Sequence, residues 1–132
     1  MCDRETVPIV SDGDVVTARQ KGRALAAGLG FSGTGQAIIA TAISELARNI
    51  LEYAKRGEII LGQLEEGGRR GILVVARDQG PGIADIARAM QDGFSTGKGL
   101  GLGLPGTRRL MGEFEIVSEV GKGTTVTTRK WV

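Results

Sequence analysis

The sequence predicts an α+β two-layer sandwich, in which helices cover one face of a mostly antiparallel, mixed sheet. Hydrophobic residues recur at helical spacing in two segments of the first half of the chain. Two pairs of apolar and β-branched segments, each pair joined by a glycine-containing turn, indicate hairpins. The 132 residues can bury one core, so we expect residues 1–132 to form a single domain.

The expected elements follow in the order strand, helix, helix, hairpin, short helix, helix and hairpin. Their ranges are about 5–10, 15–29, 32–55, 58–64 with 71–77, 84–90, 104–111, and 113–120 with 124–131. Pro8 in the first strand favours a position at the edge of the sheet, because proline cannot donate a ladder hydrogen bond. The strand at 71–77 is almost wholly apolar, which predicts a central, covered position.

Capping residues define the helices. Ser11 to Asp14 offer caps for the first helix, and Ser32 can cap the second, which Gly57 is expected to close. Pro105 stands at a tolerated first-turn position of the helix at 104–111. The residues expected to form the buried stripe of the second helix are Ile39, Ile43, Leu46, Ile50 and Tyr53.

Composition excludes several classes of function. Aromatic residues make up 4% of the chain, and the net charge of +2 comes from scattered basic pairs, so no nucleic-acid partner is expected. The chain has no histidine, which excludes a histidine-based triad or metal site, and its single cysteine, Cys2, cannot form an internal disulfide. No apolar run spans a membrane and no signal peptide is evident, so we expect a cytoplasmic protein without a membrane partner.

A glycine-rich segment lies at 93–106. Gly97, Gly99, Gly101 and Gly103 occupy every second position, with Lys98 among them. Such a pattern stabilises neither helix nor strand, but its unobstructed N–H groups and lysine suit a phosphate chain. A flexible linker is the alternative, although linkers are usually rich in serine rather than leucine.

The long second helix carries Glu45 and Asn49 one turn apart on one face. A carboxylate can accept a proton from a hydroxyl, and an amide oxygen can bind Mg²⁺. The alternative is an exposed face in which Glu45 pairs with Arg48. Asparagine is a weak helix former, so its place in mid-helix needs a reason.

Two turns complete the set of candidates. Asp78 follows the apolar strand and is followed by Gly80 and Gly82, which leave room for a flat ring, while the carboxylate can accept from a purine amine. Equally, this segment has the composition of an aspartate-initiated turn. Near the end of the chain, a glycine turn at 121–123 leads into Thr124 and Thr125, where a plain hairpin is the alternative.

These four motifs, in this order over about 80 residues, resemble those of the GHKL (Bergerat-fold) ATP-binding superfamily. That superfamily includes histidine-kinase catalytic domains, Hsp90, gyrase B and MutL. The similarity extends to the RsbT serine-protein kinases of the bacterial stressosome and covers nearly the whole chain. The segments that carry it are 44–50 (SELARNI), 78–83 (DQGPGI), 92–96 (DGFST) and 103–106 (GLPG).

The resemblance implies a Bergerat fold with a glycine-rich ATP lid at about 91–104, and roles for individual residues. Asn49 would hold Mg²⁺, Glu45 would act as general base or orient the acceptor hydroxyl, and Asp78 would bind the adenine amine. Thr125 or Thr124 would lie beside the adenine. Gly80 and Gly82 complete the adenine pocket, and the residues over the phosphates would be Lys98, Gly99, Leu100, Gly101, Leu102, Gly103 and Leu104.

The resemblance also implies an activity and partners. ATP, with Mg²⁺, would phosphorylate a serine or threonine on STAS-domain scaffold proteins of the RsbS and RsbR types. The released kinase would then activate an RsbU-like phosphatase, a switch of binding partner driven by phosphorylation. Two alternatives are an RsbW-type anti-sigma factor kinase that sequesters a sigma factor, and a nucleotide-dependent binding module with little catalysis.

Overall fold

The structure, a computed structural model, describes residues 4–80 and 104–132. Its elements are β1 (Arg4–Ile9), α1 (Asp12–Leu29), α2 (Gly33–Tyr53), β2 (Gly57–Glu66), β3 (Arg69–Asp78), α4 (Leu104–Met111), β4 (Glu113–Glu119) and β5 (Gly123–Trp131). Every element predicted within these residues is present. The short helix predicted at 84–90 lies outside the described residues.

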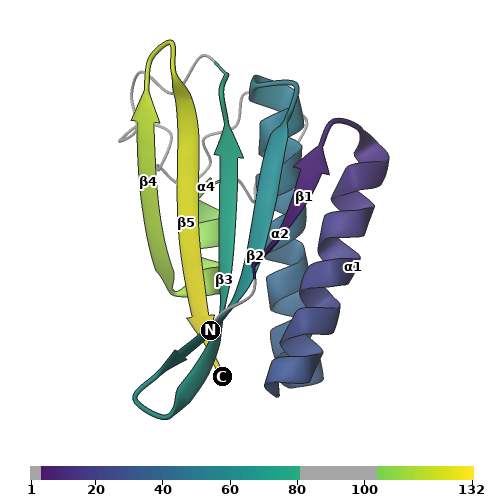
Figure 1. Cartoon of the computed structure of the whole chain (residues 1–132), viewed down its shortest axis with the longest axis vertical. Helices are drawn as coiled ribbons and strands as arrows, with labels where there is room; N and C mark the ends of the chain where they lie inside the picture. The colour runs from purple at the N-terminus through teal and green to yellow at the C-terminus, as the bar shows by residue number, and fades with distance from the viewer. Residues whose placement is uncertain (1–3, 81–103) are drawn as a thin grey trace.

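The five strands form one sheet in the order β1-β2-β3-β5-β4. The three described helices pack against one face of the sheet; in Figure 1, α4 and α2 are seen behind the strands, and α1 lies at the right, beside β1. This arrangement confirms the predicted two-layer sandwich. All four strand pairings are antiparallel, whereas the sequence prediction allowed a mixed sheet. As expected, β3 is central and β1, which contains Pro8, is an edge strand.

Helix α1 begins at Asp12, three residues before the predicted start. The reason is a cap that acts from within the first turn: Oδ2 of Asp14 accepts from the backbone N–H groups of Val10 at 2.8 Å and Ser11 at 3.0 Å. These hydrogen bonds hold the carboxyl pKa of Asp14 below its ordinary value of 3.8. An aspartate expected just before the helix is therefore its third residue.

Helix α2 begins as predicted, with Oγ of Ser32 accepting from the N–H of Gly35 at 3.1 Å. It ends at Tyr53, earlier than expected, because Lys55 adopts a left-handed conformation with φ of 70° and reverses the chain. The prediction that Gly57 closes the helix is therefore wrong: Gly57 is the first residue of β2. Tyr53 is 46% exposed, which corrects its predicted place in the buried stripe.

The first hairpin is longer than predicted. Gly67 and Gly68 both have positive φ values, 57° and 81°, as a tight two-residue turn requires. The strands consequently extend to the turn, and the ladder continues to the pair Glu66 and Arg69. The charged residues that were expected to form a loop are thus part of β2 and β3.

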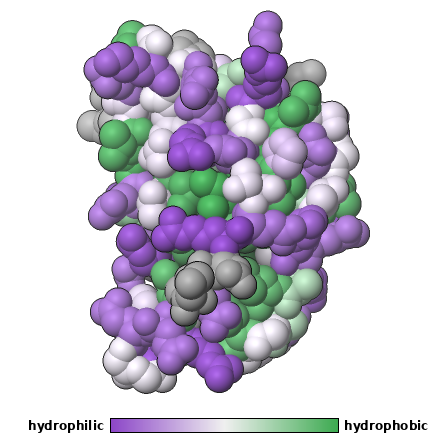
Figure 2. All heavy atoms as spheres, viewed as in Figure 1, coloured by the Kyte–Doolittle hydropathy of each residue, from purple (hydrophilic) through white to green (hydrophobic). Residues whose placement is uncertain are grey.

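The core lies between the sheet and the helices. Its largest fully buried side chains include Ile9, Ile39, Ile43, Leu46, Ile59, Leu61, Ile72, Val74 and Met111. On the opposite face of the sheet, Figure 2 shows hydrophobic side chains between hydrophilic ones. Among the described residues, no helix combines the length and hydrophobicity needed to cross a membrane.

Candidate functional site

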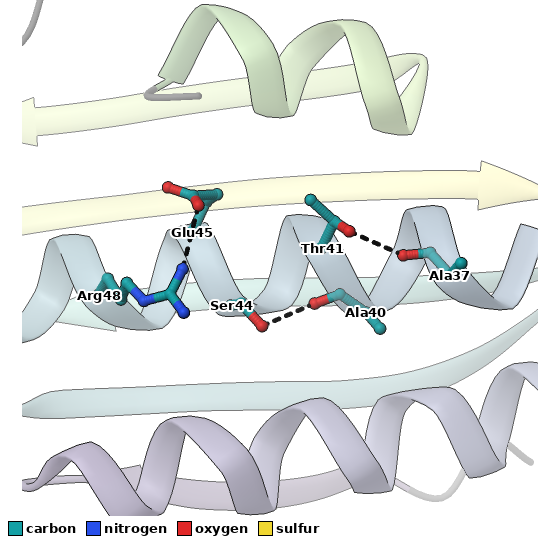
Figure 3. A network of polar contacts seen from close by, with 6 residues as sticks. All are labelled: Ala37, Ala40, Thr41, Ser44, Glu45 and Arg48. Atoms are coloured by element: carbon teal, nitrogen blue, oxygen red, sulfur yellow. Dashed lines mark hydrogen bonds and ion pairs between the residues drawn. The ribbon is translucent and has the colours of Figure 1, made fainter. Parts of the chain in front are cut away.

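Glu45 lies in the middle of α2, and its side chain is only 12% exposed. It is the one charged residue that is buried in the described part of the chain. Oε1 accepts from Nη1 of Arg48 at 3.1 Å. Figure 3 marks this contact with a dashed line. The pairing considered as an alternative from the sequence is therefore present. It does not belong to an exposed face, however, because the carboxylate is buried.

Asn49 lies one turn after Glu45 and is half-buried. Within the residues that the structure describes, its side-chain amide makes no hydrogen bond. An asparagine amide oxygen is a suitable ligand for a hard cation.

Asp78 is the last residue of β3, and its carboxylate is fixed by two backbone donors. Oδ1 accepts from the N–H of Gly80 at 2.9 Å and from the N–H of Thr124 at 3.3 Å. Across residues 4–80 and 104–132, Oδ2 has no hydrogen-bond partner. One oxygen of Asp78 therefore anchors the turn, and the other can accept from a ligand amine.

Three glycines allow the chain to pack closely around Asp78. A Cβ atom on Gly57 would lie 2.4 Å from the carbonyl oxygen of Arg77 and 2.8 Å from Ile50 Cγ2. A Cβ atom on Gly123 would lie 2.1 Å from the carbonyl oxygen of Asp78. At Gly80 it would lie 2.5 Å from Cβ of Ala54. Gly80 therefore has a packing role against the end of α2, besides the room for a ring that the sequence suggested.

The register of the sheet separates the two candidate threonines. Asp78 pairs with Thr124, and Arg77 pairs with Thr125. Because side chains alternate between faces, Thr124 shares the helix-covered face with Asp78, whereas Thr125 lies on the opposite face. Oγ1 of Thr124 is 2.8 Å from Oγ of Ser118, on the neighbouring strand β4.

The end of α2 packs against the end of β3. The close approaches of Gly57 to Ile50 and of Gly80 to Ala54 hold the last turns of α2 against the end of β3. Asn49 and Asp78 belong to these two elements. Leu104 begins α4 and packs against the core. The other predicted site residues, Gly82 and those from Lys98 to Gly103, lie outside the described residues.

Gly57 and Gly123 were not predicted as parts of the site. Gly57 was assigned to the end of a helix, and Gly123 to a hairpin turn alone. A sequence signal did exist, since each glycine stands at the start of a strand, where a β-branched residue is usual. The register that sets both beside Asp78 could not be derived from local pattern.

Comparison with known proteins identifies the family. Residues 34–131 match the family described as histidine kinase-, DNA gyrase B-, and HSP90-like ATPase. The chain is 52% identical, over 132 residues, to the serine/threonine-protein kinase RsbT of Bacillus subtilis (strain 168). The aligned residues cover all of this chain and 99% of that protein. The chain belongs to this ATPase family, as an RsbT-type serine/threonine-protein kinase.

A second relative is an anti-sigma F factor from Thermoanaerobacter sp. (strain X514). It is 35% identical over 100 residues, which cover 71% of this kinase and 68% of that protein. Membership of the ATPase family implies that the kinase uses a nucleotide.

Solved structures share the fold. The RsbU and RsbW domains of a Mycobacterium tuberculosis protein superpose with a TM-score of 0.61 at 24% identity, over 98% of this chain. The kinase spans 31% of that longer chain. The mycobacterial sensor histidine kinase MprB gives a TM-score of 0.55 at 14% identity, with 98% and 97% of the two chains covered. Both agree with the Bergerat fold.

Proposed function

We propose that residues 1–132 act as one kinase domain that phosphorylates a serine or threonine of STAS-domain scaffold proteins of the RsbS and RsbR types. The observation that carries this proposal is the 52% identity to RsbT over the whole chain. The acceptor oxygen would bond to the γ-phosphorus of ATP while the bond to the ADP oxygen breaks. The hydroxyl proton would pass to a carboxylate.

The adenine amine is proposed to bind Asp78. Support comes from the carboxylate itself, because two backbone donors fix Oδ1 while Oδ2 can accept from a ligand. Guanine presents a carbonyl oxygen in place of the amine, which a carboxylate would repel. Thr124, on the same face, is the threonine that we assign to the adenine side of the site, and Gly82 would leave room for the ring.

Asn49 is proposed to hold Mg²⁺. Among the described residues there is no cluster of three or more acidic, cysteine or histidine side chains that could hold a metal ion. This suits a metal that is bound by one protein ligand together with substrate phosphates and water, as Mg²⁺ often is. The ion would supply charge neutralisation at the phosphates.

Glu45 is proposed as the group that orients the acceptor hydroxyl and accepts its proton. Burial of a carboxylate is costly unless it has a partner or a task, and Arg48 provides only one contact. The phosphates are proposed to lie beneath a lid at about 91–104, with Lys98 as its cation. Leu104, packed against the core, would anchor the end of that lid.

The partner switch is also a proposal. Phosphorylation of the scaffold would release the kinase, which would then activate an RsbU-like phosphatase in the cytoplasm. An RsbW-type anti-sigma factor is the second candidate, supported by the 35% identity to an anti-sigma F factor. A binding module with little catalysis is the third.

One experiment separates these functions. The purified chain is incubated with Mg-ATP and an RsbS-type STAS protein, and the modified residue is mapped by mass spectrometry. We expect transfer to one serine or threonine, with loss of transfer in Glu45→Ala and loss of Mg²⁺ dependence in Asn49→Ala. Absence of phosphate on the STAS protein would favour the binding module. Retrieval of a sigma factor, instead of a phosphatase, in a pull-down would favour the anti-sigma factor.

A further inference from the structure

The contacts around Glu45 point to a role for Arg48. Glu45 is buried in α2, yet within residues 4–80 and 104–132 its carboxylate has a single side-chain partner, Nη1 of Arg48 at 3.1 Å. Figure 3 shows the Arg48 side chain reaching back along α2 to Glu45. This direction is the one that helical side chains favour.

The neighbouring hydroxyl groups on α2 do not hold Glu45. Oγ of Ser44 donates to the carbonyl oxygen of Ala40 at 2.9 Å, and Oγ1 of Thr41 donates to that of Ala37 at 2.9 Å. Both hydroxyl protons are therefore used by the backbone of the helix, as Figure 3 also shows. Within the described residues, Arg48 is therefore the side chain that makes a hydrogen bond to the Glu45 carboxylate.

A second carboxylate lies within reach of Arg48. Glu52 is four residues further along α2, a spacing that also permits an ion pair, and it is exposed. In the described structure Arg48 pairs with Glu45 and not with Glu52. The Arg48 side chain is itself 56% exposed, so it pairs with the buried carboxylate while remaining in contact with solvent. A buried carboxylate gains more from such a partner than an exposed one does.

We propose that Arg48 is a positioning residue for phosphoryl transfer. Its guanidinium holds the Glu45 carboxylate in one orientation and stabilises its charge, so that the carboxylate meets the acceptor hydroxyl. Arg48 acts through Glu45 and not on ATP. This inference rests on the proposed role of Glu45 as the group that accepts the hydroxyl proton.

A double-mutant cycle tests the inference. The variants are Arg48→Gln, Glu45→Gln, the double variant, and Arg48→Lys, each assayed with Mg-ATP and a purified RsbS-type STAS protein. We expect Arg48→Gln to lower kcat about 10-fold with KM for ATP unchanged, and Arg48→Lys to recover most of that loss. In the Glu45→Gln background, Arg48→Gln should change kcat less than about twofold.

Two controls isolate the pair. Glu52→Gln removes the other carboxylate within reach of Arg48 and should leave both kcat and the effect of Arg48→Gln unchanged. Arg23→Gln removes an exposed arginine from α1 and should leave kcat unchanged. Circular dichroism on each variant checks that the fold persists.

The outcomes separate this inference from the proposed function. If Glu45→Gln transfers phosphate as fast as the natural protein, the role of Glu45 is wrong. If Glu45→Gln is impaired but Arg48→Gln is not, the positioning role is wrong. The same conclusion follows if the two losses multiply, or if the loss appears only in KM for ATP.

Discussion

Oδ1 of Asp78 accepts a hydrogen bond from the backbone N–H of Thr124 at 3.3 Å, although the two residues are 46 positions apart in the sequence. The pairing of β3 with β5 creates this contact. The contact turns Oδ1 toward the backbone, while Oδ2 makes no hydrogen bond to the residues that the structure describes. The register of the sheet thus determines the orientation of the Asp78 carboxylate.

Asp78→Asn should abolish most nucleotide affinity. The substitution replaces one carboxylate oxygen with an NH2 group. It therefore removes either the acceptor proposed to face the adenine amine or the acceptor that anchors the turn. Loss of a charged hydrogen bond costs about 1.5–3 kcal/mol, so affinity for Mg-ATP should fall about 10- to 100-fold. Isothermal titration calorimetry measures this change. An unaltered affinity would remove Asp78 from the adenine site.

Gly123→Ala should disturb the site as well as the fold. Its φ is 114°, and a Cβ atom would lie 2.1 Å from the carbonyl oxygen of Asp78. We expect a loss of about 1–2 kcal/mol in the free energy of unfolding from the backbone conformation alone, together with weaker Mg-ATP binding. Urea unfolding and calorimetry provide the two measurements.

Gly121→Ala is the matched control for Gly123→Ala. Gly121 also has a positive φ, 82°, but in the described part of the chain no atom beyond its two sequence neighbours lies within 4 Å of the position of its Cβ. It should lose a similar amount of stability, about 1–2 kcal/mol, while its affinity for Mg-ATP stays unchanged. Equal losses of affinity in the two variants would contradict the packing argument.

Thr124→Val and Thr125→Val should differ in nucleotide binding. Only Thr124 lies on the face that carries Asp78, and its hydroxyl group contacts Ser118. Removal of one neutral hydrogen bond costs about 0.5–1.5 kcal/mol, so Thr124→Val should bind Mg-ATP roughly 2- to 10-fold more weakly. Thr125→Val should bind it normally. The reverse result would mean that the sheet register does not select the threonine.

Acid should weaken the start of α1 through Asp14. Its folded-state pKa lies below the ordinary value of 3.8, because the N–H groups of Val10 and Ser11 donate to the carboxylate. The stabilisation is therefore complete above that value and is lost as the pH falls through the lower, folded-state pKa. Asp14→Asn should be less stable than the natural protein in urea at pH 7, and the difference should shrink below pH 3.8.

Asp12→Asn serves as the control for Asp14. It removes a carboxylate from the same turn of α1, but one that accepts no hydrogen bond from Val10 or Ser11 in the described structure. We expect its stability to depend on pH as that of the natural protein does. If Asp14→Asn behaves in the same way as Asp12→Asn, the cap does not stabilise the helix.

The sequence predicted each described helix and strand, because their apolar periodicities are local. It was less accurate at the ends of elements. Asp14 caps α1 from inside its first turn, and Lys55 takes the left-handed conformation that glycine would usually supply. Local pattern also assigned Tyr53 to the core, although the last turn of α2 leaves it exposed.

The sequence by itself determined the family, the order of the four motifs and the identity of Glu45, Asn49 and Asp78 as candidates. These depend on residue type and spacing along the chain. Only the tertiary structure decided that Thr124 and not Thr125 faces Asp78, that Gly57 and Gly123 pack beside it, and that Glu45 is buried with Arg48 as its partner. The physical reason is that strand register and burial are set by segments far apart in the chain.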